Sequence, residues 1–399
     1  MKQQNKLPND WEKSEIIQLF SVETGTTPPT KDKTYWLNGT IDWITPADMN
    51  DLGNKLDLPE SKRKITEKAL KEVNLTLMPI GSIVISTRAP VGYIGLAKKE
   101  LTFNQGCKGL IPLDKSKTSA LFYAYYLASL KDYLNNISGG STFKELSKDQ
   151  LVHLEVTHPS NFQEQTAIAK ILSTTDESLE ALERERLATE RLRRGIMVRL
   201  LEKKDNLVVI GDYLNILPGY AFSSKKFSHE KKGLPLIRIR DIESKETDCY
   251  FDGEYPEEYL VKKGDILIGM DGEFNTCIWQ GEKALLNQRV CKIFPKNDSQ
   301  LDKDYLYYII QKPLKIIELT VGQTTVKHLS TKDFFKIQVP LPSLLEQKRI
   351  AEILSTIDKK LELQKARKEK IERVKKGLMD ELLTGKKRVN VEKILGDEK

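Results

Sequence analysis

The sequence has none of the motifs that mark a nucleotide-binding or catalytic site. No GxGxxG follows an expected strand, no GxxxxGK[ST] is present, and no Asp-Pro-Pro-Tyr type of methyltransferase motif occurs. The four histidines are scattered and lack the spacing of metal ligands. Asp241, Glu243 and Lys245 resemble a nuclease carboxylate set only superficially, because such a triplet arises easily in a chain with 30% charged residues. We therefore expect no catalytic residues and no metal site.

Cysteine and long apolar runs are also scarce. The four cysteines include no CxxC pair, which is typical of reduced thiols in a cytoplasmic protein. No stretch approaches the roughly 18 apolar residues that span a bilayer. The N-terminal segment has no apolar core of a signal peptide. These absences predict a cytoplasmic protein that makes no membrane contact.

Positive charge is in modest excess, with a formal net charge of +7. Residues 346–388 hold 14 Lys/Arg and 8 Asp/Glu, whereas residues 164–204 hold 9 and 8. The rest of the chain is therefore close to neutral. Any DNA-binding face there must come from charges gathered on one side rather than from overall basicity.

What the sequence does contain is an internal repeat. Gly81 and Gly264 lie 183 positions apart, and so do the pairs Asn104-Gln105 and Asn287-Gln288. From Glu164 the offset is 182, and "EQTAIAKILSTTDESLEAL" aligns with "EQKRIAEILSTIDKKLELQ". Two copies exclude a solenoid or a propeller. They favour a molecule with pseudo-two-fold symmetry, which suits a partner with two-fold character such as duplex DNA.

Each copy divides into a mixed segment and a long helix. The mixed segments alternate short β-type runs such as "GSIVIST" and "GDILIGM" with turn signals, and each has a tyrosine-rich helical stretch that we expect in the core. The helices follow expected capping boxes at Ser160-x-x-Gln163 and Ser343-x-x-Glu346. Their apolar seam predicts that they pair with each other. Because the second mixed segment folds at the far end of the first helix and the chain then returns along the second, we expect the pair to be antiparallel. The seam residues are Ile168, Leu172, Leu179, Leu182, Ile350, Leu354, Ile357 and Leu361.

The order of these features resembles the specificity (S) subunit of type I restriction-modification systems. The resemblance rests on "GSIVISTRAPVGYIG", "NQG", "GGSTFKELS", the proline ahead of "EQTAIAKIL", the repetition of this order and the closing "LLTGKKRV". It implies an α/β (α+β) fold with two globular target-recognition domains separated by two long conserved helices, packed as an antiparallel coiled coil. The expected parts are recognition domain 1 (1–158), helix 1 (159–204), recognition domain 2 (205–341), helix 2 (342–388) and a tail (389–399).

The resemblance also implies a function. Each domain would read one half of a bipartite DNA target, and the helices would set the spacer and dock two methyltransferase (modification) subunits. Restriction (translocase) subunits would join that core. The chain itself would be non-catalytic and bind no cofactor, since S-adenosylmethionine, ATP and Mg belong to the partner subunits.

Candidate DNA contacts are side chains that can hydrogen-bond base edges or phosphates. In the first domain they are Arg88, Asn104, Gln105, Lys108, Ser141, Thr142 and Lys144. In the second they are Arg238, Arg240, Gln288, Arg289, Thr324, Thr325 and Lys327. Asn and Gln at the repeated positions could instead stabilise a turn, because residues common to both domains cannot explain different targets.

Two other interpretations remain open. One is the recognition subunit of a related restriction system in which methylation and cleavage share one polypeptide. The other is a stand-alone tandem DNA-binding scaffold. The sequence does not reveal the bases read, the spacer length, the residues that contact bases, or whether the complex restricts DNA or only methylates it.

Overall fold

The computed structural model describes residues 8–52, 56–139, 145–201, 206–320 and 327–396. The chain divides into two compact units, which are described separately. The first comprises residues 1–184 and 366–399, and the second comprises residues 185–365. Each unit contains one mixed domain and part of two long helices, α7 (Phe162–Leu201) and α10 (Leu344–Leu382). We call the mixed parts the first domain and the second domain.

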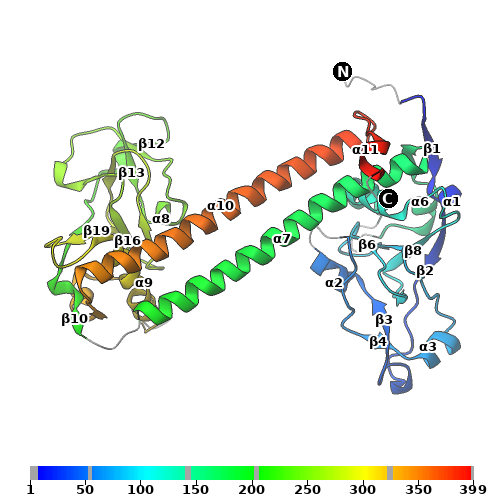
Figure 1. Cartoon of the computed structure of the whole chain (residues 1–399), viewed down its shortest axis with the longest axis horizontal. Coiled ribbons are helices and arrows are strands. Elements are labelled where there is room, and N and C mark those ends of the chain that lie inside the picture. Colours follow the sequence, from blue (N-terminus) through cyan, green and yellow to red (C-terminus); the bar gives the residue numbers. More distant parts are fainter. Residues whose placement is uncertain (1–7, 53–55, 140–144, 202–205, 321–326, 397–399) are drawn as a thin grey trace. The chain divides into compact units, whose positions relative to one another are not determined.

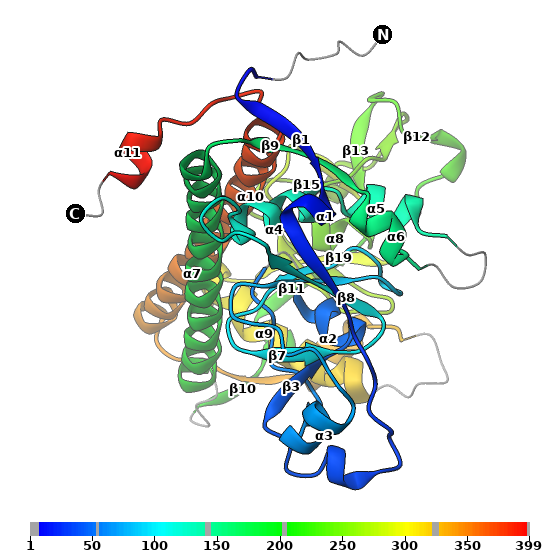
Figure 2. The same cartoon turned by 90° about the vertical axis from the view of Figure 1, so that its right-hand side faces the viewer.

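The first domain is built around a four-stranded antiparallel sheet of order β2-β8-β5-β6. A three-stranded sheet β4-β3-β7 and the pair β1-β9 complete it. In Figures 1 and 2, α3 and the β3-β4 pair lie at one end of the unit, away from β1. The strands are β1 (Trp11–Glu15), β2 (Phe20–Thr24), β3 (Ile41–Ile44), β4 (Lys64–Ile65), β5 (Ile83–Ser86), β6 (Ile94–Leu96), β7 (Leu101–Phe103), β8 (Cys107–Pro112) and β9 (Glu155–Pro159). The helices of this unit, besides the long ones, are α1 (Ile16–Leu19), α2 (Pro46–Met49), α3 (Glu67–Glu72), α4 (Ala120–Ser129), α5 (Lys131–Ile137), α6 (Lys148–Val152), α11 (Val391–Leu395) and the 3₁₀ turns η1 (Lys33–Tyr35) and η2 (Asn50–Leu52).

The second domain has the same four-stranded sheet, in the order β11-β19-β16-β17. A five-stranded sheet β12-β14-β13-β18-β15 and the pair β10-β20 accompany it. The strands are β10 (Leu207–Val209), β11 (Leu214–Pro218), β12 (Phe227–Ser228), β13 (Leu234–Ile237), β14 (Tyr250–Phe251), β15 (Leu260–Val261), β16 (Ile266–Gly269), β17 (Thr276–Ile278), β18 (Ala284–Leu286), β19 (Val290–Pro295) and β20 (Gln338–Pro340). The helices are α8 (Asp241–Ser244), α9 (Lys303–Thr320) and the 3₁₀ turns η3 (Ile210–Asp212), η4 (Ser224–Lys226), η5 (Glu257–Tyr259) and η6 (Thr331–Lys336).

Corresponding sequences form corresponding structures in the two domains. The central strands β5 and β16 are buried along their whole length, as expected for continuous apolar runs without polar alternation. The tyrosine-rich stretches form α4 and α9, and Tyr123 and Tyr305 are fully buried. The prediction that the tyrosines of these stretches lie in the core is confirmed for these two and for Tyr125 and Tyr308, but it is wrong for Tyr133, which lies on α5 and is 52% exposed.

Charged pairs show that α7 and α10 run antiparallel in each unit. In the first unit Lys368 Nζ lies 3.1 Å from Glu183 and Lys375 Nζ lies 2.5 Å from Asp176. In the second unit Lys360 Nζ lies 3.0 Å from Glu185, and an Arg193–Asp358 pair follows at 2.5 Å. In both units the α10 partner number falls as the α7 number rises. The predicted fold class, two mixed domains alternating with two long antiparallel helices, is confirmed.

The predicted caps are right for one helix and shifted for the other. Ser343 Oγ accepts a hydrogen bond from Glu346 N at the start of α10, at 3.4 Å. The helix α7 begins at Phe162, so its capping side chain is Asn161, whose Oδ1 accepts from Gln163 N at 2.8 Å. The prediction of Ser160 as the cap is therefore wrong by one residue. Both serine and asparagine suit this role, and the sequence offers them side by side.

Candidate nucleic-acid interface

In the first domain, residues far apart in sequence meet where β5 ends and β8 begins. Arg88 follows β5, and its backbone N–H donates to Gly106 O at 3.1 Å, in the turn that carries Asn104 and Gln105. An isolated bridge joins Arg88 to Glu145, and their side chains pair at 3.1 Å. We call this group the first turn cluster: Arg88, Asn104, Gln105, Lys108 and Glu145.

The second domain repeats this arrangement where β16 ends and β19 begins. The backbone N–H of Met270 donates to Arg289 O at 2.8 Å, and Gly272 N donates to Lys327 O at 2.9 Å. An isolated bridge joins Asp271 to His328. The structure thereby gathers a second turn cluster at the corresponding position: Asp271, Gln288, Arg289, Lys327 and His328.

The two clusters carry opposite charges at one pair of equivalent positions and different side chains at another. The offset that relates Gly81 to Gly264 also relates Arg88 to Asp271 and Glu145 to His328. The first domain thus places a cation where the second places an anion, and across the bridge it places a carboxylate where the second places an imidazole. In the second cluster Asp271 accepts from His328 Nδ1 at 2.6 Å and pairs with Arg289 Nε at 3.2 Å. The two domains therefore share the backbone arrangement of these turns but differ in the side chains that the turns carry.

Arg289 is also unusual in its backbone. Its φ of 72° lies in the left-handed region, which costs a non-glycine residue about 1 kcal/mol or more. Its side chain is 67% exposed, whereas that of its partner Asp271 is only 19% exposed. An exposed guanidinium held by a half-buried carboxylate is presented in one direction, as a base-reading arginine requires.

The side chains predicted to contact DNA in the repeated turns differ in their exposure and in the hydrogen bonds they already make. Asn104 Oδ1 accepts a hydrogen bond from Gly106 N at 2.9 Å, which closes its turn. Gln105 is exposed and accepts a hydrogen bond from the Thr27 hydroxyl. Lys108 is only 6% exposed, and burial lowers the pKa of its amine. Gln288 is exposed, and Lys327 lies 4.0 Å from Glu318.

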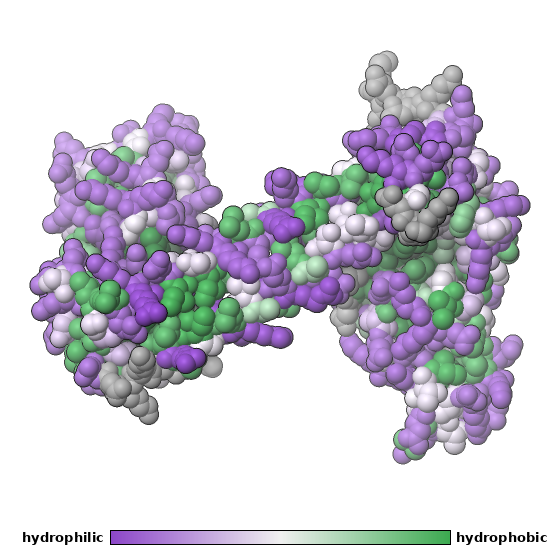
Figure 3. All heavy atoms as spheres, in the orientation of Figure 1, coloured by the Kyte–Doolittle hydropathy of each residue, from purple (hydrophilic) through white to green (hydrophobic). Residues whose placement is uncertain are grey.

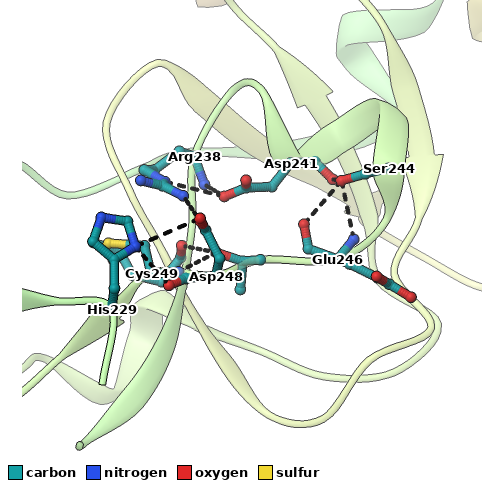
Figure 4. A network of polar contacts seen from close by, with 9 residues as sticks. His229, Arg238, Asp241, Ser244, Glu246, Asp248 and Cys249 are labelled. Atoms are coloured by element: carbon teal, nitrogen blue, oxygen red, sulfur yellow. Dashed lines mark hydrogen bonds and ion pairs between the residues drawn. The ribbon is translucent and has the colours of Figure 1, made fainter. Parts of the chain in front are cut away.

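Arg238 belongs to a closed polar network. It follows β13, and its side chain is only 15% exposed between two carboxylates (Figure 4). Asp241 Oδ2 accepts from the backbone N–H of Arg238 at 2.8 Å and from its Nε at 3.3 Å, and Asp248 accepts from the other end of the guanidinium. Burial alone would lower the pKa of Arg238, but the hydrogen bonds to Asp241 and Asp248 outweigh it and raise the pKa. This guanidinium is occupied within the domain, whereas the neighbouring Arg240 is exposed.

Five predicted contacts lie outside the described residues. They are Ser141, Thr142, Lys144, Thr324 and Thr325. The segments that carry them adjoin Glu145 in the first turn cluster and Lys327 in the second. Among the described residues, no group of three or more His, Cys, Asp or Glu could hold a metal ion. None of the helices in the described ranges is long and apolar enough to cross a membrane.

Sequence reasoning missed Asp271, Glu145 and His328. Aligning the two copies in the register of Gly81 and Gly264 would have found them, because in that register Asp271 faces the oppositely charged Arg88 and His328 takes the place of Glu145. The pairing itself could not be read from the sequence. It depends on two loops of each domain meeting, and their conformations are set by tertiary contacts.

The predicted seam of the long helices has two kinds of residue. Ile168 and Leu172 are fully buried in the core of the first domain, and Ile350 and Leu354 are at most 2% exposed in that of the second. These four residues therefore contact a domain as well as the helix pair. The remaining seam positions are Leu182, which is buried, and Leu179, Ile357 and Leu361, which are half-buried.

The comparison with protein families decides what this architecture is. Residues 8–189 and 204–373 each match the type I restriction modification DNA specificity domain. The chain belongs to this family. Each of the two sequence repeats thus carries one specificity domain, and both matches extend into a long helix.

Relatives in this family match different shares of the chain. The specificity subunit of the type I restriction enzyme MjaIX of Methanocaldococcus jannaschii is 29% identical over 371 residues, or 84% of each chain. The specificity subunit of the Escherichia coli type I restriction enzyme EcoBI is 44% identical over 162 residues, which is 41% of this chain and 34% of that one. The crystal structure of the type I restriction-modification S subunit from M. genitalium has a TM-score of 0.64 at 19% identity, covering 96% and 98% of the two chains. That likeness shows the fold.

Proposed function

We propose that this chain is the sequence-specific DNA-recognition subunit of a type I restriction-modification complex, with each domain reading one half of a bipartite target. The observation that carries this proposal is the pair of turn clusters. Both are built on equivalent strands, yet Arg88 and Asp271 give equivalent positions opposite charge. Two recognition domains that share a backbone scaffold but present different side chains are suited to recognising two different half-sites.

The long helices are the proposed docking site for two copies of a methyltransferase subunit. The visible face of α7 and α10 shows hydrophobic residues among hydrophilic ones (Figure 3). Leu192 and Val374 are equivalents in the helix repeat, and they are 56% and 50% exposed on their helices. Two equivalent exposed apolar side chains are what two identical partners require, because each partner would meet the same surface.

The catalytic steps belong to the partners in this proposal. The chain is a non-catalytic subunit, while S-adenosylmethionine, ATP and Mg are bound by methyltransferase and restriction (translocase) subunits. The complex acts on cellular double-stranded DNA and therefore works in the cytoplasm. The match of both repeats to the type I restriction modification DNA specificity domain favours this function over a stand-alone scaffold.

Native mass spectrometry of the chain co-expressed with its methyltransferase tests the docking. We expect two methyltransferase subunits for each copy of this chain. Leu192→Glu should leave one, because it places a charge in one of two equivalent contacts. Leu187→Glu is the matched control, since Leu187 is 41% exposed on the same helix and its equivalent is already Glu369. A stable chain that retains no methyltransferase would overturn the proposal.

A further inference from the structure

Each recognition domain is tied to its long helix by a tyrosine and an aspartate. In the first unit Tyr125 on α4 donates its hydroxyl hydrogen to Asp176 Oδ2 on α7, at 2.7 Å. In the second unit Tyr308 on α9 donates to Asp358 Oδ2 on α10, at 3.0 Å. The tyrosines correspond in the repeat of the domains and the aspartates in the repeat of the helices, so the two contacts are equivalent.

The same two carboxylates also hold the other long helix. Asp176 Oδ1 lies 2.5 Å from Lys375 Nζ on α10, and Asp358 Oδ1 lies 2.5 Å from Arg193 Nε on α7. Lys375 and Arg193 are again equivalents in the helix repeat. Each aspartate therefore joins three segments, namely the helix of a recognition domain, its own long helix and the antiparallel partner helix.

These contacts are sheltered from solvent. The side chains of Lys375 and Arg193 are 12% and 24% exposed, so water and salt screen their charges less than at the surface. Burial, reinforced by the hydrogen bond to the aspartate, raises the pKa of Tyr125 and of Tyr308. Both hydroxyls consequently remain protonated donors at neutral pH. Hydrogen bonds to a carboxylate are among the strongest that side chains form.

A glutamine provides a second tie in each unit. Gln165 Oε1 on α7 accepts from Ser119 N, the capping residue of α4, at 2.9 Å. Gln347 Oε1 on α10 accepts from Asp302 N, just ahead of α9, at 2.8 Å. In both units the glutamine precedes the aspartate by about three helical turns, which is roughly 16 Å along the helix. One contact would allow a domain to swivel, whereas two separated contacts fix its direction on the helix pair.

We propose that Asp176 and Asp358 are positioning residues that fix the direction of each recognition domain on the helix pair and so enforce the spacing between the two half-sites. This inference rests on the proposed function. It separates two properties of one protein. The turn clusters determine which bases are recognised, while the aspartates determine how strongly the protein prefers half-sites separated by the native number of base pairs.

Removing single hydroxyl groups tests the inference. The complex of the full chain with its methyltransferase subunits is assayed on DNAs that carry both wild-type half-sites, with the native spacer or one base pair more or fewer. For Tyr125→Phe and for Tyr308→Phe we expect the preference for the native spacer to fall by about tenfold, which corresponds to about 1.4 kcal/mol. The rejection of altered bases within either half-site should match that of the wild type. Tyr133→Phe, which removes a tyrosine hydroxyl from a side chain 52% exposed on α5, should retain the full preference.

The outcomes are distinguishable. An unchanged spacer preference in folded variants, or an equal loss of rate at every spacer, would contradict the positioning role and leave the proposed function standing. A wild-type complex that methylates no bipartite site would instead overturn the proposed function itself. Asp176→Asn provides a second test, because it keeps the side chain's shape while removing the charge that Lys375 pairs with. It should relax the spacer preference at least as far as Tyr125→Phe.

Discussion

The second unit contains a polar layer between α7 and α10 that we predict to be a source of instability. Thr189 and Gln364 are both 6% exposed, and Gln364 Nε2 donates to Thr189 Oγ1 at 3.4 Å. Gln364 Oε1 is buried and has no hydrogen-bond partner among the described residues. In the first unit the equivalent positions of the helix repeat are Leu182 and Ile371. The equivalent contact between α7 and α10 is therefore polar in the second unit and apolar in the first.

The double substitution Thr189→Ile with Gln364→Leu transfers the apolar solution to the second unit. It removes the long hydrogen bond between the two side chains, which contributes about 0.5 kcal/mol. It also removes the bond that Thr189 Oγ1 donates to Glu185 O at 2.9 Å within α7, which contributes little because a threonine bond to the carbonyl four residues earlier does not stabilise a helix. Against these losses it relieves a buried acceptor whose lack of a partner costs about 1–3 kcal/mol. We expect a net stabilisation of about 2 kcal/mol. The reverse change, Leu182→Gln with Ile371→Thr, is the matched control and should destabilise the first unit by a similar amount.

Hydrogen exchange measured by mass spectrometry reports on these helices locally. Amides of peptides covering residues 185–201 and 355–365 should exchange roughly 30-fold more slowly in the apolar variant, which is the factor that about 2 kcal/mol represents. Peptides of the first unit should be unaffected. Faster exchange in the apolar variant would refute the reasoning, because it would show that the polar pair stabilises the helix contact.

Three further predictions concern charged side chains of the domains. Arg238→Ala should destabilise the second unit by about 3 kcal/mol, because it leaves the 7% exposed Asp241 carboxylate without its cation. Arg289→Ala should change the free energy of unfolding by less than about 0.5 kcal/mol, yet weaken discrimination between bases at one half-site by about 1–3 kcal/mol. Thermal unfolding measures the first effect, and methylation of DNAs with altered half-sites measures the second. If Arg238→Ala and Arg289→Ala destabilised the protein equally, the structural role of Arg238 and the DNA-contacting role of Arg289 would be contradicted. Asp42 is 2% exposed with Lys99 Nζ at 2.6 Å, and although its burial alone would raise its pKa, the hydrogen bonds from Lys99 and Ser61 lower it. Its contribution to stability is therefore present above the unfolded-state pKa of about 3.9 and lost as the pH falls through the lower folded-state pKa. The difference in melting temperature between wild type and Asp42→Asn should stay constant above about pH 5 and shrink below about pH 4, and a gap that widens in acid would contradict the sign.

The repeat made the architecture predictable. Equivalent residues in two copies impose equivalent surroundings, so the antiparallel helices and the buried, equivalent tyrosines Tyr125 and Tyr308 followed from sequence spacing and periodicity. Helical pairing is a property of regularly spaced side chains on one face, and that regularity is visible in the sequence.

The partners of individual side chains were harder to predict from the sequence. Arg238 was a plausible reader of bases by residue type, yet Asp241 and Asp248 hold its guanidinium inside the domain. The turns that bring these groups together depend on tertiary contacts rather than on local preference. The same holds for the Arg88–Glu145 pair, whose members lie far apart in the sequence.

The most direct test of the proposal that each domain recognises one half-site is methylation mapping after a domain exchange. A host expresses this chain with its methyltransferase, and a second host expresses the chain with residues 1–158 replaced by the same block of a relative. Base-resolution sequencing of methylated sites then gives both targets. We expect two bipartite targets of equal spacer length that share one half-site and differ in the other. A change in both half-sites, or a single undivided target, would contradict the account.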